Sequence, residues 1–231
     1  AGGAPAGGRA AGAAGAAAST AVEPFSGLTA RGWRMKPEKW RSLMQSRQHV
    51  PLDRTGGLGA AGAGERDAVL VGVVYEKAIP KTSSRGERFI SWRLTDLMFP
   101  KPNMVTLYLF GEAFEQWGKE EEMPVRHGSL VALLNPAPLP GRPAGEGGGS
   151  DAGGLASVRI SHGTQLVVLG ECPALGFCSA TKKDGMKCSL PCHRDRGLHV
   201  CYFHNMQKAT QFARKGGAAA TGGGGAAGAG R

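Results

Sequence analysis

Four residues near the C-terminal end of the sequence have the types and spacing of a metal site. Cys178, Cys188, Cys201 and His204 are separated by nine, twelve and two residues. Zn²⁺ binds four thiolate or imidazole ligands in a tetrahedron, and three cysteines with one histidine supply such a set. The segment has too few apolar residues for a core of its own, and a structural metal would supply the missing folding energy. The pattern therefore predicts one structural Zn²⁺.

The exact ligand set stays open at this point. Cys192, His193 and His199 lie in the same segment, and any of them could replace one of the four. A catalytic zinc needs an open coordination position with an acid or base nearby, and Asp184 and Asp195 are the only acids inside the segment. The composition therefore favours a closed structural site. Five cysteines in a chain without a visible export signal also favour metal over disulfides and a reducing compartment, cytosol or nucleus.

The metal segment is also strongly basic. Between residues 172 and 215 there are eight Lys or Arg against two Asp or Glu, in a chain of formal net charge +10. Lys182, Lys183 and Lys187 lie between the first two cysteines, on a turn that the metal would hold at both ends. Such a stretch is typical of a polyanion partner, and pinning lowers the entropy lost on binding. The alternative is a solvated surface rich in lysine.

The elements that position this segment read as a β-barrel. Strands are expected at residues 68–75, 88–94, 104–110 and 129–134, with a helix at 112–119 between the third and fourth. Residues 158–160 and 166–169 supply a closing strand that is interrupted near Gly163. This order is that of the five-stranded OB-fold, so the chain is predicted to be mainly β. An SH3-like barrel is the alternative, but it lacks the helix.

If the barrel is an OB-fold, its binding face can be located. Oligonucleotides bind the middle strands, between the loop after strand 1 and the loop after strand 4, here residues 77–88 and 135–154. The candidate DNA-binding residues of the barrel are Lys77, Lys81, Arg85, Arg88, Phe89 and Trp92. Basic groups contact phosphates and aromatic rings stack on bases. Phe89 and Trp92 are three residues apart on an alternating strand, so one faces the core and the other the surface, and which is which stays open.

The chain divides into five parts. Residues 1–22 are predicted to be a disordered Ala/Gly leader, 23–66 a basic helical arm and linker, 67–171 the barrel, 172–208 the zinc finger and 209–231 a disordered Gly/Ala tail. In the arm, residues 37–48 read as a helix with Trp40, Leu43 and Met44 on its apolar face. No stretch reaches the roughly 20 apolar residues that span a bilayer, so no membrane partner is expected.

These residues resemble the minichromosome maintenance protein ten family of eukaryotic replication factors. The resemblance covers about residues 25–208 and rests on Phe25-Ser26-Gly27-Leu28, on residues 89–97 and 107–112 of the barrel, and on residues 177–185, Cys188 and Cys201-Tyr202-Phe203-His204 of a CCCH finger. The loop at 135–154 is longer than usual, and the Cys192-His193 pair adds candidate ligands.

The resemblance implies a nuclear, non-enzymatic scaffold that binds single-stranded and, more weakly, double-stranded DNA. It implies a role in replication initiation and fork progression, in contact with the replicative helicase, DNA polymerase alpha–primase and the sliding clamp. Family DNA-binding positions map to Lys77 or Lys81, to Phe89, and to Lys182 with Lys183. The alternative is an adapter whose OB cleft binds partner peptides. An enzyme is not expected, because metal-dependent phosphoryl transfer needs clustered carboxylates and the acids here are scattered.

Overall fold

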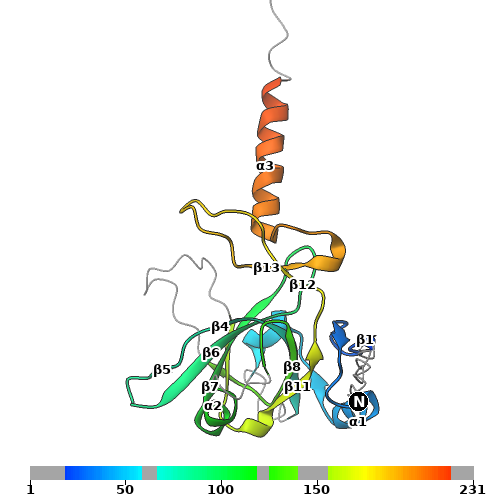
Figure 1. Ribbon diagram of the computed structural model, residues 1–231, viewed down its shortest axis with the longest axis vertical. Helices are drawn as coiled ribbons and strands as arrows, with labels where there is room; N and C mark the ends of the chain where they lie inside the picture. Colours follow the sequence, from blue (N-terminus) through cyan, green and yellow to red (C-terminus); the bar gives the residue numbers. More distant parts are fainter. Residues whose placement is uncertain (1–18, 59–66, 119–124, 140–155, 220–231) are drawn as a thin grey trace, which may run out of the picture.

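Six strands form a closed barrel at the centre of the computed structural model, which describes residues 19–58, 67–118, 125–139 and 156–219 (Figure 1). They are β4 (Ala68–Lys77), β6 (Arg88–Thr95), β7 (Met104–Phe110), β8 (Ser129–Leu134), β10 (Ala156–Ile160) and β11 (Leu166–Glu171). The sheet runs β11-β8-β4-β6-β7-β10. β10 pairs in parallel with β7, and the chain continues through a 3₁₀ turn at Gly163–Gln165 into β11, which is antiparallel to β8. The predicted closing strand is thus β10 and β11 together, which pair with the two ends of the sheet. Helix α2 (Gly111–Trp117) follows the third barrel strand, β7, and precedes the fourth, β8. The OB-fold prediction is confirmed.

Every second side chain on the barrel strands points inward, and these side chains fill the barrel interior. Ile90, Trp92 and Leu94 of β6 point inward, as do Leu107 and Leu109 of β7. Positions between them on both strands are partly exposed. This period of two is expected for strands with one buried face.

Strand β4 is buried on both faces. Leu70 and Val74 belong to the barrel core, whereas Val71, Val73 and Tyr75 belong to a second core. The N-terminal arm consists of β1 (Thr20–Val22), β2 (Thr29–Arg31), α1 (Pro37–Met44), β3 (Gln48–His49) and a 3₁₀ turn (Leu52–Gly57). Its Leu28, Ala30, Trp40 and Met44 cover the second core, whereas Leu52 of the 3₁₀ turn belongs to the barrel core. Trp40 of α1 is the largest fully buried side chain that the arm contributes, and Trp33 packs beside this core partly buried.

The arm begins earlier in the chain than its composition predicts. Residues 20–22 fall in the predicted disordered leader, but they form β1 and pair with β2. The reason is Glu23, whose fully buried carboxylate accepts hydrogen bonds from the backbone N–H groups of Phe25 and Ser26 and from Trp40 Nε1. Residues 1–18 lie outside the described residues. Helix α1 ends at Met44, four residues before the predicted end.

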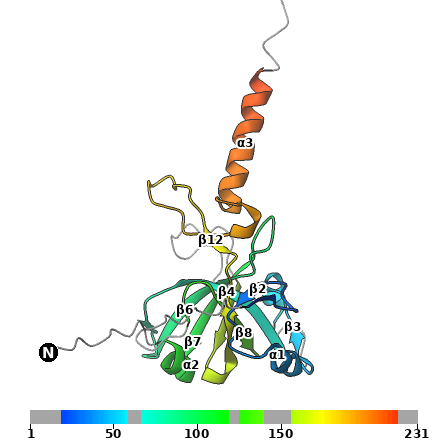
Figure 2. The same cartoon turned by 45° about the vertical axis from the view of Figure 1, so that its right-hand side comes forward.

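The finger stands above the barrel and ends in a long helix. β12 (Leu175–Phe177) pairs with β13 (Pro191–His193), a 3₁₀ turn follows at Arg194–Arg196, and α3 (Tyr202–Ala219) points away from the barrel (Figures 1 and 2). The prediction of a disordered tail from residue 209 is wrong for residues 209–219, because Lys, Gln, Arg and Ala dominate there and propagate a helix well. Residues 220–231 are outside the description.

Two short strands modify the predicted loops. β5 (Lys81–Thr82) pairs with β6 inside the loop after the first barrel strand. β9 (Ala137–Leu139) pairs with β10 at the start of the predicted 135–154 loop, whose residues 140–154 are not described. Within the described ranges no helix is long and apolar enough to cross a membrane.

Candidate metal centre and nucleic-acid surface

The four predicted ligands converge in the finger. Cys178 Sγ and Cys201 Sγ lie 3.4 and 3.3 Å from His204 Nδ1, and the Sγ atoms of Cys188 and Cys201 are 4.0 Å apart. All four donor atoms lie within 4.8 Å of one another. Zinc bonds of about 2.3 Å to sulfur and about 2.0 Å to nitrogen put tetrahedral ligands roughly 3.5–3.8 Å apart. The donor set and its spacing fit a metal ion.

Backbone hydrogen bonds hold the ligands in place. The N–H of Cys178 donates to the carbonyl of Leu190 at 3.0 Å, and the N–H of Cys188 donates to Ala180 at 2.9 Å. Cys201 and His204 lie at the start of α3, where the Cys201 carbonyl accepts the first helical bond from Asn205. One turn of helix therefore brings two ligands together.

The thiols are buried, and this affects their ionisation. Burial raises the pKa of Cys201 to about 12. Burial also opposes ionisation of Cys178, but backbone hydrogen bonds at Cys201 and Ala180 hold its pKa below the ordinary value. The buried residues of this cluster are the three cysteines themselves, and their neighbours such as Leu190 and Val200 are only partly buried. The finger thus has no apolar core besides its ligands.

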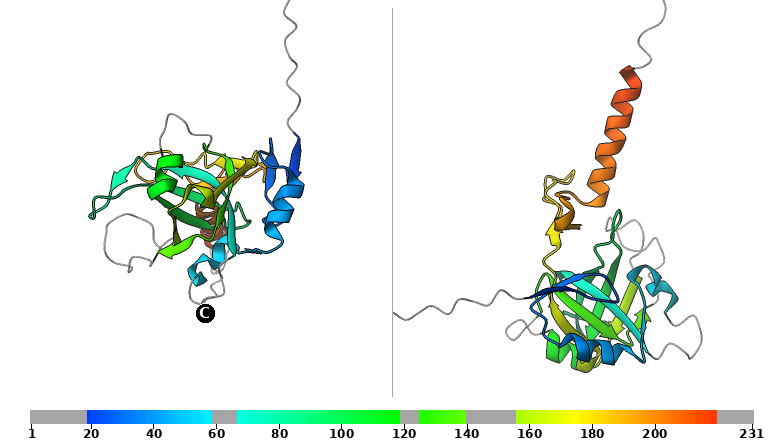
Figure 3. Two further views of the ribbon diagram at one scale, coloured as in Figure 1. Left: turned by 90° about the horizontal axis from the view of Figure 1, so that it is seen from below. Right: turned by 90° about the vertical axis from the view of Figure 1, so that its right-hand side faces the viewer.

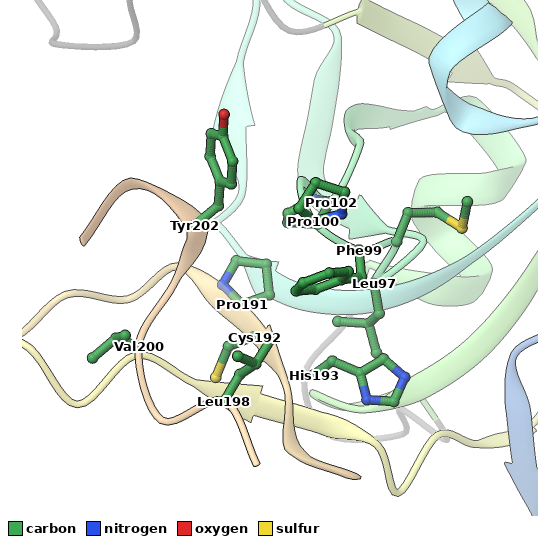
Figure 4. Close-up of a pocket in the computed structure, with 11 residues that line it drawn as sticks. Leu97, Phe99, Pro100, Pro102, Pro191, Cys192, His193, Leu198, Val200 and Tyr202 are labelled. Carbon is green, nitrogen blue, oxygen red and sulfur yellow. The ribbon is translucent and has the colours of Figure 1, made fainter. Parts of the chain in front are cut away.

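The alternative ligands lie outside the cluster. Cys192 is buried, but on β13, where its Sγ faces Gly176. The imidazole of His193 lines a small cavity with Leu97 and Phe99 (Figure 4). His199 is exposed, and its carbonyl accepts from Ser179. The structure therefore favours the predicted set over these three residues.

The finger is docked on the loop between β6 and β7. Phe99 and Pro102 of this loop face Pro191 and Tyr202 of the finger (Figure 4), and the Arg196 guanidinium lies 5.3 Å from the Phe99 ring. Asp96 holds the loop by accepting hydrogen bonds from Met98 N and from Asn103 N and Nδ2. Cys172, at the junction of barrel and finger, is buried in the second core. The finger therefore contacts the barrel both through this loop and through the buried junction residue.

The basic turn between the first two ligands is a hairpin. Thr181 and Lys187 form an antiparallel bridge, and Lys182 N donates to the Met186 carbonyl at 2.8 Å. Gly185 takes a φ of +81°, which suits a residue without a Cβ. The side chains of Lys182, Lys183 and Lys187 are all exposed. The three cations are thus carried on a short hairpin between two ligands.

Three basic candidates of the barrel are exposed to solvent, whereas the fourth, Lys77, contacts other parts of the barrel. Lys81, Arg85 and Arg88 are exposed on the β5–β6 hairpin. Lys77 is partly buried, its Nζ donates to the Val125 carbonyl at 2.9 Å, and it lies 5.1 Å over the Trp92 ring. Of the two lysines at this family position, Lys81 is therefore the better placed for a ligand.

The two aromatic candidates also separate. Trp92 is 0% exposed in the barrel core, so the prediction that it stacks on DNA is wrong. Phe89 is the partly exposed residue of the pair, on the outer face of β6.

Three residues on the same outer face were not among the candidates predicted from the sequence: Tyr108, Phe110 and Arg159. Phe89 lies 5.9 Å from Tyr108 and 5.3 Å from Phe110 between ring centroids. Arg159 of β10 is exposed and lies opposite Tyr108 in register. The signal was present in the alternation of residues 104–110, because Leu107 and Leu109 face inward and so direct Tyr108 and Phe110 outward.

The candidate surfaces share one side of the molecule. The β5–β6 hairpin and the basic hairpin of the finger lie on the same side in Figures 1 and 2. The arm lies on the opposite side of the barrel, as the view from below in Figure 3 also shows. A ligand could therefore contact the barrel and the finger together without meeting the arm.

Comparison with known proteins gives a consistent result. The family described as MCM10 OB-fold matches residues 24–150. The chain is 29% identical to the mouse protein MCM10 homolog over 196 residues, which is 84% of this chain and 20% of the mouse protein. The human homolog is 29% identical over 184 residues, 79% of this chain and 19% of that protein. Minichromosome maintenance protein 10 of Saccharomyces cerevisiae is 31% identical over 135 residues, 57% of this chain and 21% of the yeast protein. The chain spans about a fifth of the length of these curated relatives.

Proposed function

Because the chain belongs to the MCM10 family, whose OB-fold matches residues 24–150 of 231, we propose that it is a non-enzymatic DNA-binding scaffold of replication. Its ligand is single-stranded DNA and, more weakly, double-stranded DNA. The supporting observation is that the metal-pinned hairpin with Lys182, Lys183 and Lys187 lies on the same side as the exposed cations of the β5–β6 hairpin. Cations on two ordered hairpins can contact one backbone with little loss of entropy.

We propose Zn²⁺ as the ion of the finger, with a structural role. Three thiolates and one imidazole are a ligand set typical of structural zinc, and the four leave no position for a substrate. The ion would fix both ends of the basic hairpin. Its contribution to DNA binding is therefore indirect, through the shape of the finger.

The wider role is proposed on the family alone. In this role the protein acts in the nucleus, in replication initiation and fork progression, and links the replicative helicase to DNA polymerase alpha–primase, with the sliding clamp as a further partner. DNA binding is the part of this role that this chain itself would carry.

A salt titration with charge reversal tests the DNA proposal. Lys182→Glu with Lys183→Glu should weaken binding to a labelled single strand and lower the log–log salt slope by about one for each phosphate that the finger no longer neutralises. Arg34→Glu with Lys39→Glu is the matched control, since both residues are exposed on the arm. If the finger variant and the control lower affinity equally, net charge alone explains the binding and the finger is not part of the surface.

A second candidate function is a protein-interaction adapter. The observation in its favour lies away from the OB cleft: a cavity of about 290 Å³ between the arm and the β6–β7 loop. Its apolar wall includes Leu52 and Val71, and its rim carries Phe25 and Met98, which are 38% and 55% exposed. Exposed apolar residues that gather on a surface are typical of protein-interaction sites. Phe25→Asp with Met98→Asp should then abolish binding of polymerase alpha–primase while DNA affinity is unchanged, and unaltered binding of both would exclude this cavity.

A further inference from the structure

We infer that Ser84, in the turn of the β5–β6 hairpin, is a phosphorylation site. A Ser/Thr protein kinase that selects basic substrates modifies it and thereby weakens DNA binding. The hairpin extends outward from the barrel, on the side away from the arm (Figures 1 and 3). The inference rests on the proposed function, because this hairpin carries one of the two cationic surfaces, and it adds a means of regulating that surface.

Three hydroxyl groups lie together in this hairpin, and their hydrogen bonds distinguish them. Thr82 belongs to β5, where it pairs with Arg88 of β6. Ser83 closes the turn, because its Oγ accepts a hydrogen bond from the N–H of Glu87 at 3.1 Å and its own N–H donates to the Glu87 carbonyl at 2.8 Å. Ser84 is exposed, and its hydroxyl forms no hydrogen bond with any of the described residues. Ser84 is therefore the hydroxyl that an enzyme can modify without breaking the turn.

The residues around Ser84 carry the charge that basic-directed kinases recognise. Lys81 precedes Ser84 by three residues, Arg85 follows it directly and Arg88 lies four residues beyond it. All three cations are exposed. Such kinases hold substrate cations with carboxylates near the active site, through charge-assisted hydrogen bonds. Glu87 is the single acid between residues 81 and 88, so three cations against one acid give the hairpin a formal net charge of +2.

A second serine has similar neighbours but a different setting. Ser42 is exposed, with Lys39 three residues before it and Arg41 directly before it. It lies within α1, so a kinase that binds its substrate segment in an extended conformation would have to unwind this helix and expose the buried Trp40. The β5–β6 hairpin is easier to open, because β5 has only two residues and both are exposed. The structure therefore favours modification of Ser84 over Ser42.

The modification replaces a neutral hydroxyl by an anion. The γ-phosphoryl group of ATP is transferred to Ser84 Oγ: the bond from Oγ to phosphorus forms, and the bond from phosphorus to the oxygen between the β- and γ-phosphates breaks. The hydroxyl proton goes to a base of the kinase, and ADP leaves. Phosphoserine carries a charge of about −1.5 to −2 at pH 7, so the hairpin falls from +2 to about zero. Its cations then no longer attract DNA phosphates.

The first part of the test asks whether the site is modified. The folded protein is incubated with ATP, Mg²⁺ and the catalytic domain of protein kinase A or protein kinase C, and the phosphate is located by mass spectrometry. We expect phosphate on Ser84, and Ser84→Ala should remove this signal. The inference is overturned if neither kinase modifies Ser84, or if Ser42 is modified as fast.

The second part measures the effect on DNA binding. Phosphoserine inserted in place of Ser84 during translation gives fully modified protein without any kinase. This protein should bind a labelled single strand roughly 25-fold more weakly at about 0.1 M salt, with a log–log salt slope lower by about 1.4, because two phosphate contacts of about 0.7 each are lost. Ser84→Ala should bind as the unaltered protein does, and the melting temperature should not change, since Ser84 is exposed.

Phosphoserine in place of Ser42 is the matched control, because it adds the same charge to the arm, on the opposite side of the barrel. It should leave both affinity and salt slope unchanged. Equal weakening by the two phosphoserines would mean that net charge alone acts, and unchanged binding with phosphoserine at position 84 would mean that the hairpin is not regulated; either result overturns the inference. If the unmodified protein binds no DNA, the proposed function fails and the regulatory part of the inference fails with it, whereas the mass spectrum still decides whether Ser84 is modified.

Discussion

Replacing Cys201 by serine should unfold the finger and leave the barrel folded. The Cys201 side chain is buried, with Sγ 3.3 Å from His204 Nδ1 and 4.0 Å from Cys188 Sγ. A serine hydroxyl is a poor zinc ligand, so the site would keep only three donors. The ion would then dissociate or be held weakly.

The size of the effect follows from what else holds the finger together. Leu190 and Val200 are the larger aliphatic side chains packed against the cysteines, and both are only partly buried. Even full burial would give about 1.5–3 kcal/mol for each. Structural zinc supplies about 10–16 kcal/mol in zinc-finger peptides. Because the metal stabilises the finger by more than the aliphatic side chains do together, the finger should not remain folded without it.

The chain offers a probe for each part. Trp33, Trp40, Trp92 and Trp117 all lie in the arm or the barrel, so tryptophan fluorescence reports unfolding of these parts alone. Amide exchange at residues 178–188 reports the finger, where the N–H groups of the first two ligands are hydrogen-bonded. Zinc analysis should find no bound ion in the variant, and exchange in the finger should become fast. The tryptophan melting temperature should change by only a few degrees.

Cys192→Ser is the matched control, because this thiol is buried in the same finger but lies outside the ligand cluster. It should retain one zinc per chain and slow exchange in the finger. Retention of a full equivalent of zinc by Cys201→Ser, or loss of zinc from Cys192→Ser, would refute the ligand assignment. If the melting transition followed by tryptophan fluorescence is instead lost when the finger unfolds, the barrel does not fold independently of the finger.

Three further changes test the fold. Glu23→Ala leaves the N–H groups that donate to its carboxylate without partners, so it should cost about 2–5 kcal/mol by urea denaturation, whereas the exposed Glu38→Ala should change stability by less than about 0.5 kcal/mol. Trp92→Ala should cost about 3–5 kcal/mol because it empties the barrel core, and Phe89→Ala should cost clearly less; equal losses would place both rings in the core. Burial lowers the pKa of His49, so protonation favours the unfolded chain, and stability that is fully present above about pH 6.5 should fall as the pH drops through the lowered pKa. His49→Gln should flatten this decline in melting temperature between about pH 6.5 and 5, and an unchanged profile would mean that His49 is not its source.

The barrel was predictable from sequence because its strands alternate clearly. The third and fourth barrel strands were predicted with the bounds that β7 and β8 have. Alternation could also have separated the two aromatic candidates, since Ile90 and Leu94 share the phase of Trp92, and Phe89 shares the phase of Ser91 and Arg93. Position along one strand therefore contained enough information to place Trp92 in the core.

Features that depend on distant residues were not predictable. β1 forms because Trp40, 17 residues beyond Glu23 in the chain, donates to that buried carboxylate, and composition alone reads residues 1–22 as a leader. The engagement of Lys77 depends on the Val125 carbonyl, 48 residues away. By contrast, the metal ligands were predictable, because cysteine and histidine are the residue types that bind zinc and their spacing in the sequence is that of a zinc finger. Excluding Cys192 as a ligand required the structure, which places it on β13.

The two outer faces of the barrel explain where its function can lie. The apolar residues on both sides of β4 require a cover for the outer side, and the arm supplies it with Trp40 and Met44. The arm is therefore part of the fold, and deleting it would expose Val71, Val73 and Tyr75 together. The outer side of β6 and β7 has large rings too, yet the second core under the arm includes none of them, and polar Ser91 and Arg93 lie on the same face of β6 as Phe89. Leaving three rings open costs solubility and gains no folding energy from burial, since apolar surface is stabilising only when it is removed from water. A ligand that stacks on the rings would remove them from water at the moment of binding, which supports the proposal that the barrel binds DNA on this side.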